Sequence, residues 1–384
     1  MASHTFSLEG RALKLDSAAD IAPFLAELDA ISELREINLS GNTLGVEACK
    51  ALAGALKSKT GLQEANLADM FTGRLREEIP ESLEHLLPVL QTLPDLHTIN
   101  LSDNALGLAA IEPLSAFLSQ HVALRHLVLA NNGLGPIAGA KVADSLAQLA
   151  AVKAAAGTPY ALESVICGRN RLESGSMDAW SACFAVHPAI REVRFYQNGI
   201  RQEGIETLLL GGLAQCQRLQ RLDLQDNTFT IKGALALAKV VANWRAELVE
   251  LAIGDCLLSA RGGAVLGQAL LDAGRFPNLR ILRLQYNEID AAGAGLIKDA
   301  VATTLTEIER VELNGNCFAD DDPVVDAFAA VFDERGIGEL DDLSDMEVDS
   351  DDDDDDDESG ASDNETEAEV DALADAIDST HIAN

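Results

Sequence analysis

The chain has 384 residues, with 28 Lys and Arg against 63 Asp and Glu, which gives a formal net charge of −35. This charge repels nucleic-acid phosphates and anionic lipid, so it argues against both as partners and favours a basic protein partner. No apolar run is long enough to span a membrane, and the first ten residues lack the apolar segment of a secretory signal.

A short pattern, Leu-x-x-Leu-x-Leu-x-x-Asn-x-Leu, recurs ten times along the chain. One copy runs through Leu96, Ile99, Leu101, Asn104 and Leu106. Successive copies begin 28 to 38 residues apart, which is typical of leucine-rich repeats. A faint eleventh copy lies around residues 8–15. The ten clear copies begin at Leu34, Leu62, Leu96, Leu124, Leu162, Ile190, Leu219, Leu248, Leu279 and Ile308.

Each repeat has room for one strand, one turn and one helix. The Leu-x-Leu segment alternates as a half-buried strand does, and residues 46–57, 108–119 and 201–215 carry helical apolar stripes. Because each strand returns through a helix, the strands must be parallel. The sequence therefore predicts an α/β leucine-rich repeat solenoid of about 11 repeats, a horseshoe like that of ribonuclease inhibitors, with a concave parallel sheet and outer helices. The repeated Asn is expected to bond its amide to loop backbone.

Two copies break the period. The first carries six extra residues in the loop 68–78, where Met70 replaces the repeated Asn and Arg74 projects from an otherwise acidic rim. An ordinary surface arginine paired with Glu77 or Glu78 is the alternative interpretation. A helix is expected to begin near Pro80. The second insertion, near residues 151–159, is Ala-rich and predicts a helix extension followed by a loop.

The residue just before the repeated Asn is expected at the carboxyl end of each strand, facing solvent or a ligand. Asn131 is distinctive there because its amide both donates and accepts hydrogen bonds. The alternative is that Asn131 only tolerates a tight turn beside Gly133. The row consists of Gly41, Asp69, Asp103, Asn131, Arg169, Gln197, Asp226, Asp255, Tyr286 and Gly315.

The composition changes near the carboxyl end. Residues 1–338 are predicted to form one continuous leucine-rich repeat domain, and residues 339–384 an acidic tail. The tail holds 21 acidic residues and no Lys or Arg, including an unbroken run at 351–357. Such a segment cannot bury enough apolar surface to fold, so it is predicted to be disordered.

The sequence shows no motif of a self-contained active site. It has no phosphate-binding loop, no nucleophile elbow and no zinc-binding histidine pair. The six cysteines form no C-x-x-C pair and are interpreted as small buried hydrophobes in a reducing, cytoplasmic compartment. Function is therefore expected in binding a partner protein, with no cofactor or metal of the chain's own.

Eight segments together resemble one known family. The chain is similar along its whole array, and into its acidic tail, to the GTPase-activating proteins for the small GTPase Ran, in their fungal form. The segments are FTGR at 71–74, LSDNALG at 101–107, LANNGLGP at 129–136, ICGRNRLESGSM at 166–177, QNGIRQEGIE at 197–206, LDLQDNTFT at 222–230, LRLQYNEI at 282–289 and ELNGN at 312–316.

The resemblance implies a partner and a mechanism. It implies that the chain binds Ran in its GTP-bound form, with a Ran-binding protein as a further partner, and supports nucleocytoplasmic transport. GTP and Mg²⁺ would belong to Ran, so the chain would be an activator and not an enzyme. The Asn with which the family positions the catalytic Gln of Ran matches Asn131, and the family's important loop arginine matches Arg74.

Several roles stay open. Arg74 is expected to dock on Ran or to brace its loop, with an arginine finger as the alternative. Arg76, Asp103, Arg169 and Arg171 are expected to contact the partner. A monomer is expected, in the cytoplasm or at the periphery of the nuclear envelope. The competing hypotheses are a binding scaffold or inhibitor without GTPase activation, and an adaptor for histones or nuclear transport that works through the acidic tail.

Overall fold

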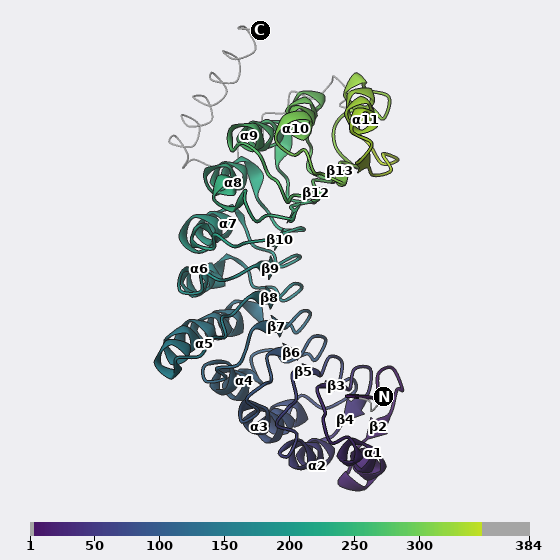
Figure 1. Ribbon diagram of the computed structural model, residues 1–384, viewed down its shortest axis with the longest axis vertical. Coiled ribbons are helices and arrows are strands. Elements are labelled where there is room, and N and C mark those ends of the chain that lie inside the picture. The colour runs from purple at the N-terminus through teal and green to yellow at the C-terminus, as the bar shows by residue number, and fades with distance from the viewer. Residues whose placement is uncertain (1–3, 348–384) are drawn as a thin grey trace. The chain divides into compact units, whose positions relative to one another are not determined.

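The computed structural model of the protein describes residues 4–347 (Figure 1). The described residues divide into two compact units, of which the first ends at Asn227 and the second begins at Thr228, and each is described by itself. The expectation of one continuous array over residues 1–338 stays a prediction. Each repeat of a solenoid packs only against its neighbours, so a long array need not form a single body. The predicted disorder of the tail concerns residues that, from 348 onward, lie outside the described residues.

In the first unit, short strands form where the repeats carry their Leu-x-Leu segments. Neighbouring strands are parallel and in register, as where Ile99 pairs with Leu127 and Leu127 with Val165. These central residues are buried, as the apolar pattern predicts. The paired series is β1 (Thr5–Ser7), β3 (Glu36–Asn38), β5 (Glu64–Asn66), β6 (Thr98–Asn100), β7 (His126–Val128), β8 (Ser164–Ile166), β9 (Glu192–Arg194) and β10 (Arg221–Asp223), beside the separate pair β2 (Lys14–Leu15) and β4 (Thr43–Leu44).

Helices connect these strands and bury their apolar stripes beneath them. In the helix over residues 46–56, Ala48, Leu52 and Leu56 are all buried, which is the stripe expected from a spacing of four. The helices of this unit are α1 (Ala18–Ala30), α2 (Val46–Leu56), α3 (Glu78–Gln91), α4 (Ile111–Leu118), α5 (Gly135–Ala156), α6 (Met177–Ala185) and α7 (Gln202–Thr207).

The predicted helices are found, with local differences. Helix α4 begins three residues later than expected. Helix α7 ends at Thr207. The chain beyond it forms a π-helical turn (Leu208–Gly212) and then a 3₁₀ turn (Leu213–Gln215). The Ala-rich insertion does extend α5, which ends at Ala156 where Gly157 takes a left-handed φ of 62°.

The second unit repeats the same design. Its strands pair in parallel, as where Leu282 pairs with Val311. Its elements are α8 (Thr230–Trp244), β11 (Glu250–Ala252), α9 (Ser259–Asp272), β12 (Ile281–Arg283), α10 (Ala291–Thr303), β13 (Arg310–Glu312), α11 (Pro323–Arg335) and β14 (Glu339–Leu340).

Both ends of the array carry more repeat structure than the clear sequence copies indicate. The faint first copy is real, because Leu8 and Leu15 are buried beside β1 and β2. The predicted boundary at 338 is wrong, because β14 pairs with β13 and the Asp341 carboxylate accepts the backbone N–H of Leu313 at 2.7 Å. Strand pairing uses backbone groups, so an acidic segment can still extend the sheet.

The repeated asparagines form a ladder under the strand ends, as predicted. The Nδ2 of Asn132 donates to the carbonyls of Leu101 and Leu129, both at 2.9 Å, and its Oδ1 accepts the backbone N–H of Asn104 at 3.0 Å. Each amide thereby joins two successive repeats through groups that have no strand partner. The cysteines also behave as expected, since five of the six are buried and free.

Candidate functional site

The row of residues before the ladder shares one backbone conformation. All ten have φ between 46° and 71°, in the left-handed region. Arg169, Gln197 and Tyr286 adopt it as well as Asn131, although asparagine is among the residues that adopt it most readily. The tight turn by itself therefore does not require an asparagine at position 131.

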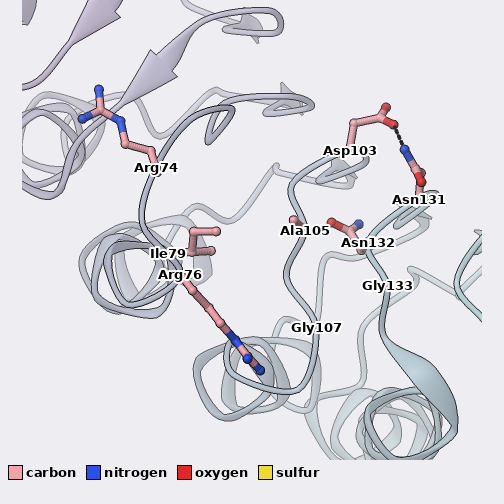
Figure 2. A pocket seen from close by; sticks show the side chains of 9 residues that line it. All are labelled: Arg74, Arg76, Ile79, Asp103, Ala105, Gly107, Asn131, Asn132 and Gly133. Atoms are coloured by element: carbon pink, nitrogen blue, oxygen red, sulfur yellow. Dashed lines mark hydrogen bonds between the residues drawn. The ribbon is translucent and has the colours of Figure 1, made fainter.

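Two members of the row in successive repeats are hydrogen-bonded to each other. Asp103 follows β6 and Asn131 follows β7, and both side chains are exposed. The Nδ2 of Asn131 donates to the Oδ1 of Asp103 at 2.7 Å, the dashed line in Figure 2. The backbone N–H of each donates to the next repeat, Asp103 to Ala130 at 3.0 Å and Asn131 to Gly168 at 2.9 Å. Their positions are thus set by the stacking of the repeats.

An open pocket of about 600 Å³ adjoins this pair. Its walls come from three successive repeats: the loop 71–77 with the start of α3, the turn 103–107 and the turn 131–133. Figure 2 shows Arg76 extending from the first of these toward the turn at Gly107. The pocket therefore brings together four predicted site residues, Arg74, Arg76, Asp103 and Asn131. The lining residues are Arg74, Arg76, Ile79, Asp103, Ala105, Gly107, Asn131, Asn132 and Gly133.

The guanidinium of Arg74 is engaged inside the chain. Its Nη1 lies 2.6 Å from the Oδ1 of Asp16, its Nε donates to the Oγ1 of Thr43 at 2.8 Å, and its Nη2 donates to the Thr43 carbonyl at 3.0 Å. Only 8% of the side chain is exposed, and it points away from Asn131 in Figure 2. The ion pair with Glu78, the alternative interpretation from the sequence, is present only as a longer contact, with Nη1 3.9 Å from the Oε1 of Glu78. This arrangement ties the loop 71–77 to the turn before α1.

The other predicted arginines have free side chains. Arg76, Arg169 and Arg171 are exposed, and within residues 4–347 none of the three guanidinium groups has a hydrogen-bond or ion-pair partner. Arg76 lines the pocket, whereas Arg169 and Arg171 lie in the turn after β8, outside its lining. The structure therefore brings only the first of them to Asn131's pocket.

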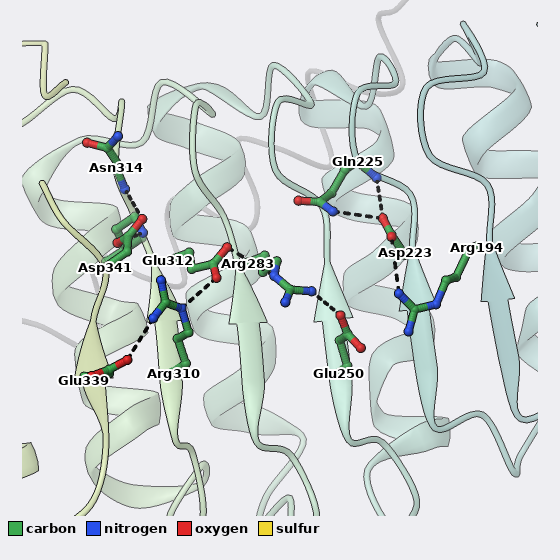
Figure 3. A network of polar contacts seen from close by, with 11 residues as sticks. Arg194, Asp223, Gln225, Glu250, Arg283, Arg310, Glu312, Asn314, Glu339 and Asp341 are labelled. Carbon is green, nitrogen blue, oxygen red and sulfur yellow. Dashed lines mark hydrogen bonds and ion pairs between the residues drawn. The ribbon is translucent and has the colours of Figure 1, made fainter. Parts of the chain in front are cut away.

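Charges on the exposed face of the strands are paired with each other. In the first unit, Arg194 contacts Glu192 at 2.7 Å and Asp223 at 4.0 Å. In the second unit, Arg283 bridges Glu250 and Glu312, and Arg310 bridges Glu312 and Glu339, both at 2.8 Å (Figure 3). This pairing leaves the free cations of the turns as the more available charges for a partner.

The described residues contain neither a metal-binding cluster nor a membrane-spanning helix. Residues 4–347 contain no group of three or more His, Cys, Asp or Glu side chains placed to hold a metal ion. Among the helices in that range, none combines the length and the apolar character needed to cross a membrane.

Comparison with known proteins decides the family. The Ran GTPase-activating protein 1 of Saccharomyces cerevisiae is 41% identical over 336 residues, which cover 86% of this chain and 82% of the yeast protein. This chain belongs to the Ran GTPase-activating protein family. The Xenopus laevis member of the family, Ran GTPase-activating protein 1, is 39% identical over 50% of this chain and 34% of its own. The chain thus spans most of the yeast relative but about a third of the frog one.

More distant similarity reflects the repeat. The Leucine Rich repeat model matches residues 33–53, 215–238 and 277–297. The ribonuclease inhibitor of Sus scrofa is 28% identical over 63% of this chain and 50% of its own. With the parallel strands and connecting helices described above, these matches confirm the predicted leucine-rich repeat solenoid.

Sequence reasoning missed the groups that shape the pocket of this family member. Ile79, Ala105 and Gly107 line it, but no motif distinguishes them from other turn and helix residues. It also missed Asp16 and Thr43 as the partners of Arg74. Thr43 lies one repeat earlier in the chain and Asp16 two repeats earlier, so only the stacking of repeats reveals the contact.

Proposed function

We propose that this chain accelerates the hydrolysis of GTP on the small GTPase Ran. The observation that carries the proposal is the 41% identity to a Ran GTPase-activating protein over 86% of the chain. It is supported by the position of Asn131, exposed at a pocket that Arg76 and Asp103 also line. In this proposal GTP and Mg²⁺ are bound by Ran, and the chain performs no hydrolysis of its own.

Asn131 is proposed to act on the catalytic glutamine of Ran. In small GTPases a glutamine orients the water that attacks the γ-phosphate. An amide held at a fixed place can bond that glutamine and restrict it to the productive orientation. Misplacement by about 1 Å can cost on the order of a hundredfold in rate. Asn131 suits the role because the backbone beneath it is held by the next repeat.

Arg74 is proposed to brace the site and not to enter the nucleotide pocket of Ran. An arginine finger must place a free guanidinium on the transferring phosphoryl group. The guanidinium of Arg74 is already bonded to Asp16 and Thr43, and its side chain is 8% exposed. The same burial weighs against a docking contact on Ran, the other role expected for Arg74. The brace supports the loop that carries Arg76.

The exposed cations are proposed to dock the partner. Although the chain is strongly acidic, it has free positive charges near Asn131, namely Arg76, Arg169 and Arg171. These charges suit acidic groups on Ran. Asp103 is kept as a candidate contact. The acidic residues after 338 would attract a basic surface and speed encounter, an effect that salt weakens.

The wider role follows the family. We propose that the chain works as a monomer on GTP-bound Ran in the cytoplasm or at the nuclear periphery, with a Ran-binding protein as a further partner, and supports nucleocytoplasmic transport. The six cysteines without a disulfide agree with a reducing compartment.

Single-turnover hydrolysis of GTP on Ran, with catalytic amounts of this chain, tests the proposal. We expect acceleration by the parent chain and a drop in the maximal rate of roughly a hundredfold for Asn131→Ala, with little change in the affinity for Ran. Unchanged hydrolysis with the parent chain would refute GTPase activation. A loss of affinity alone in Asn131→Ala would refute the glutamine-positioning role.

Charge reversal tests the docking surface. Arg169→Glu and Arg171→Glu should slow association and weaken its salt dependence. Arg218→Glu is the matched control, because Arg218 is exposed but precedes β10, at the opposite ends of the strands. An equal effect of the control would show that only net charge matters.

A binding scaffold without GTPase activation is the second candidate. The similarity to a ribonuclease inhibitor favours it. Under this alternative the chain would bind Ran, and GTP hydrolysis would stay at the intrinsic rate.

A further inference from the structure

The hydrogen bond between Asp103 and Asn131 has a direction. An ionised carboxylate carries no proton, so it can only accept. The group of Asn131 that faces the Oδ1 of Asp103 at 2.7 Å must therefore be its NH₂. The other end of the amide, the Oδ1 carbonyl of Asn131, is left to face a partner. Without such a neighbour an exposed amide could turn over and present either end.

We propose that Asp103 is a positioning residue that holds Asn131 as a hydrogen-bond acceptor for the partner's glutamine. This inference rests on the proposed function. A glutamine amide also has two different ends. An acceptor on this chain selects its NH₂, and the glutamine carbonyl is then directed to accept from the attacking water. A donor on this chain would select the opposite orientation and leave an NH₂ facing the water.

The stacking of the repeats fixes the relative position of the Asp103 and Asn131 side chains. Asp103 and Asn131 occupy the same position in successive repeats, with φ of 60° and 54°. Strands β6 and β7 pair in register, as where Asn100 pairs with Val128. Both side chains therefore leave the same edge from backbones that cannot slide past each other.

The preceding acidic member of the row makes a different bond. Asp69 accepts from the hydroxyl of Thr72, within its own turn. The bond across two repeats therefore depends on an amide following a carboxylate in the row. This ordering explains why position 103 would require a carboxylate and not merely a residue that tolerates a left-handed turn.

Asp103→Asn tests the proposal with little change of shape. Asparagine also adopts left-handed φ readily, but its amide can donate or accept, so it no longer selects the orientation of Asn131. We expect the maximal single-turnover rate on GTP-loaded Ran to fall about tenfold, with the dissociation constant within about twofold of the parent. Asp226→Asn, in the same row and equally altered in charge, should leave both values unchanged.

The Asn131→Ala background separates positioning from direct contact. If Asp103 acts through Asn131, then Asp103→Asn has no further effect on the rate in that background. An equal loss in both backgrounds, or a change confined to the dissociation constant, would overturn the proposal in favour of a direct contact with Ran. The parent and Asn131→Ala rates report on the proposed function itself. If Asn131→Ala is slower than the parent as expected but Asp103→Asn has the parent's rate, only the positioning role of Asp103 is refuted.

A measurement on the free protein gives an independent readout. In nitrogen-15 spectra, the side-chain NH₂ signals of Asn131 should shift in Asp103→Asn, whereas those of the buried ladder residue Asn170 should stay in place. No shift at Asn131 would show that the bond is not populated, and would also overturn the proposal.

Discussion

The guanidinium of Arg74 and the carboxylate of Asp16 form a 2.6 Å ion pair that ties the loop after β5 to the turn before α1. The same guanidinium donates to the carbonyl and the hydroxyl of Thr43, which lies in the intervening repeat. One side chain thus fastens three repeats together beside the pocket, at a place where Met70 interrupts the asparagine ladder.

The brace predicts a loss of stability together with a loss of activity. Arg74→Ala should lower the free energy of unfolding by about 1–3 kcal/mol, because the carbonyl of Thr43 loses a charged donor. Urea unfolding measures it. Asp16→Asn should also lower GTPase activation, but less than Arg74→Ala does, because it removes only one partner of the guanidinium. An arginine finger predicts instead that Arg74→Ala unfolds like the parent and that Asp16→Asn activates normally.

Two buried histidines predict acid sensitivity. The Nε2 of His121 lies 2.6 Å from the Leu96 carbonyl and that of His187 lies 2.7 Å from the Leu146 carbonyl. Burial lowers the pKa of both imidazoles below 6.5, so the unfolded chain binds protons that the folded chain does not. Stability should therefore be greatest above about pH 6.5 and should fall as the pH drops below it.

Unfolding in urea at pH 7.5 and pH 5.5 checks this direction. Replacing His121 and His187 together by Gln, which keeps a donor but does not titrate, should reduce the difference between the two urea midpoints. His4→Gln is the control, because His4 is exposed. A difference that persists in the double variant would assign the acid sensitivity to other groups.

The ladder predicts a large cost for one buried amide. The Nδ2 of Asn170 donates to the carbonyls of Leu129 and Cys167, and its Oδ1 accepts from the backbone of Asn132. Asn170→Ala should cost about 2–4 kcal/mol of stability, because it leaves several buried backbone groups without a partner. Asn100→Ala, which loses one local bond at a partly exposed position, should cost much less. Calorimetry of the two variants compares them, and equal costs would contradict the ladder's role.

The corrected boundary predicts different behaviour for two truncations. A chain that ends at residue 347 keeps β14 and the bonds that Asp341 and Asp345 make to the turn at Asn314. A chain that ends at 338 loses them and exposes the edge of β13. We expect the shorter chain to melt several degrees lower in a thermal scan, and the longer one to match the full chain. Equal melting of both truncations would return the boundary to 338.

The pattern of apolar residues was enough to predict the repeat fold. Leucines at fixed spacing can be buried only by strands that stack in parallel, and the recurring Asn can satisfy loop backbone only in a ladder. Both requirements, burial of the leucines and satisfaction of the loop backbone, recur in each repeat. The resemblance to a known family likewise pointed to Asn131, because its motif is contiguous in the chain.

Contacts between repeats could not be read from the sequence. Nothing in the local sequence says that Arg74 contacts Asp16 and Thr43, that Asn131 contacts Asp103, or that residues 339–340 add a strand. Such contacts depend on how far each turn is rotated and shifted relative to the next, and insertions change that alignment. Burial and strand direction could be predicted from the apolar spacing alone, because each repeat carries its own pattern. Which polar side chains face one another depends on distances between repeats, and these distances are set only when the repeats stack in the folded protein.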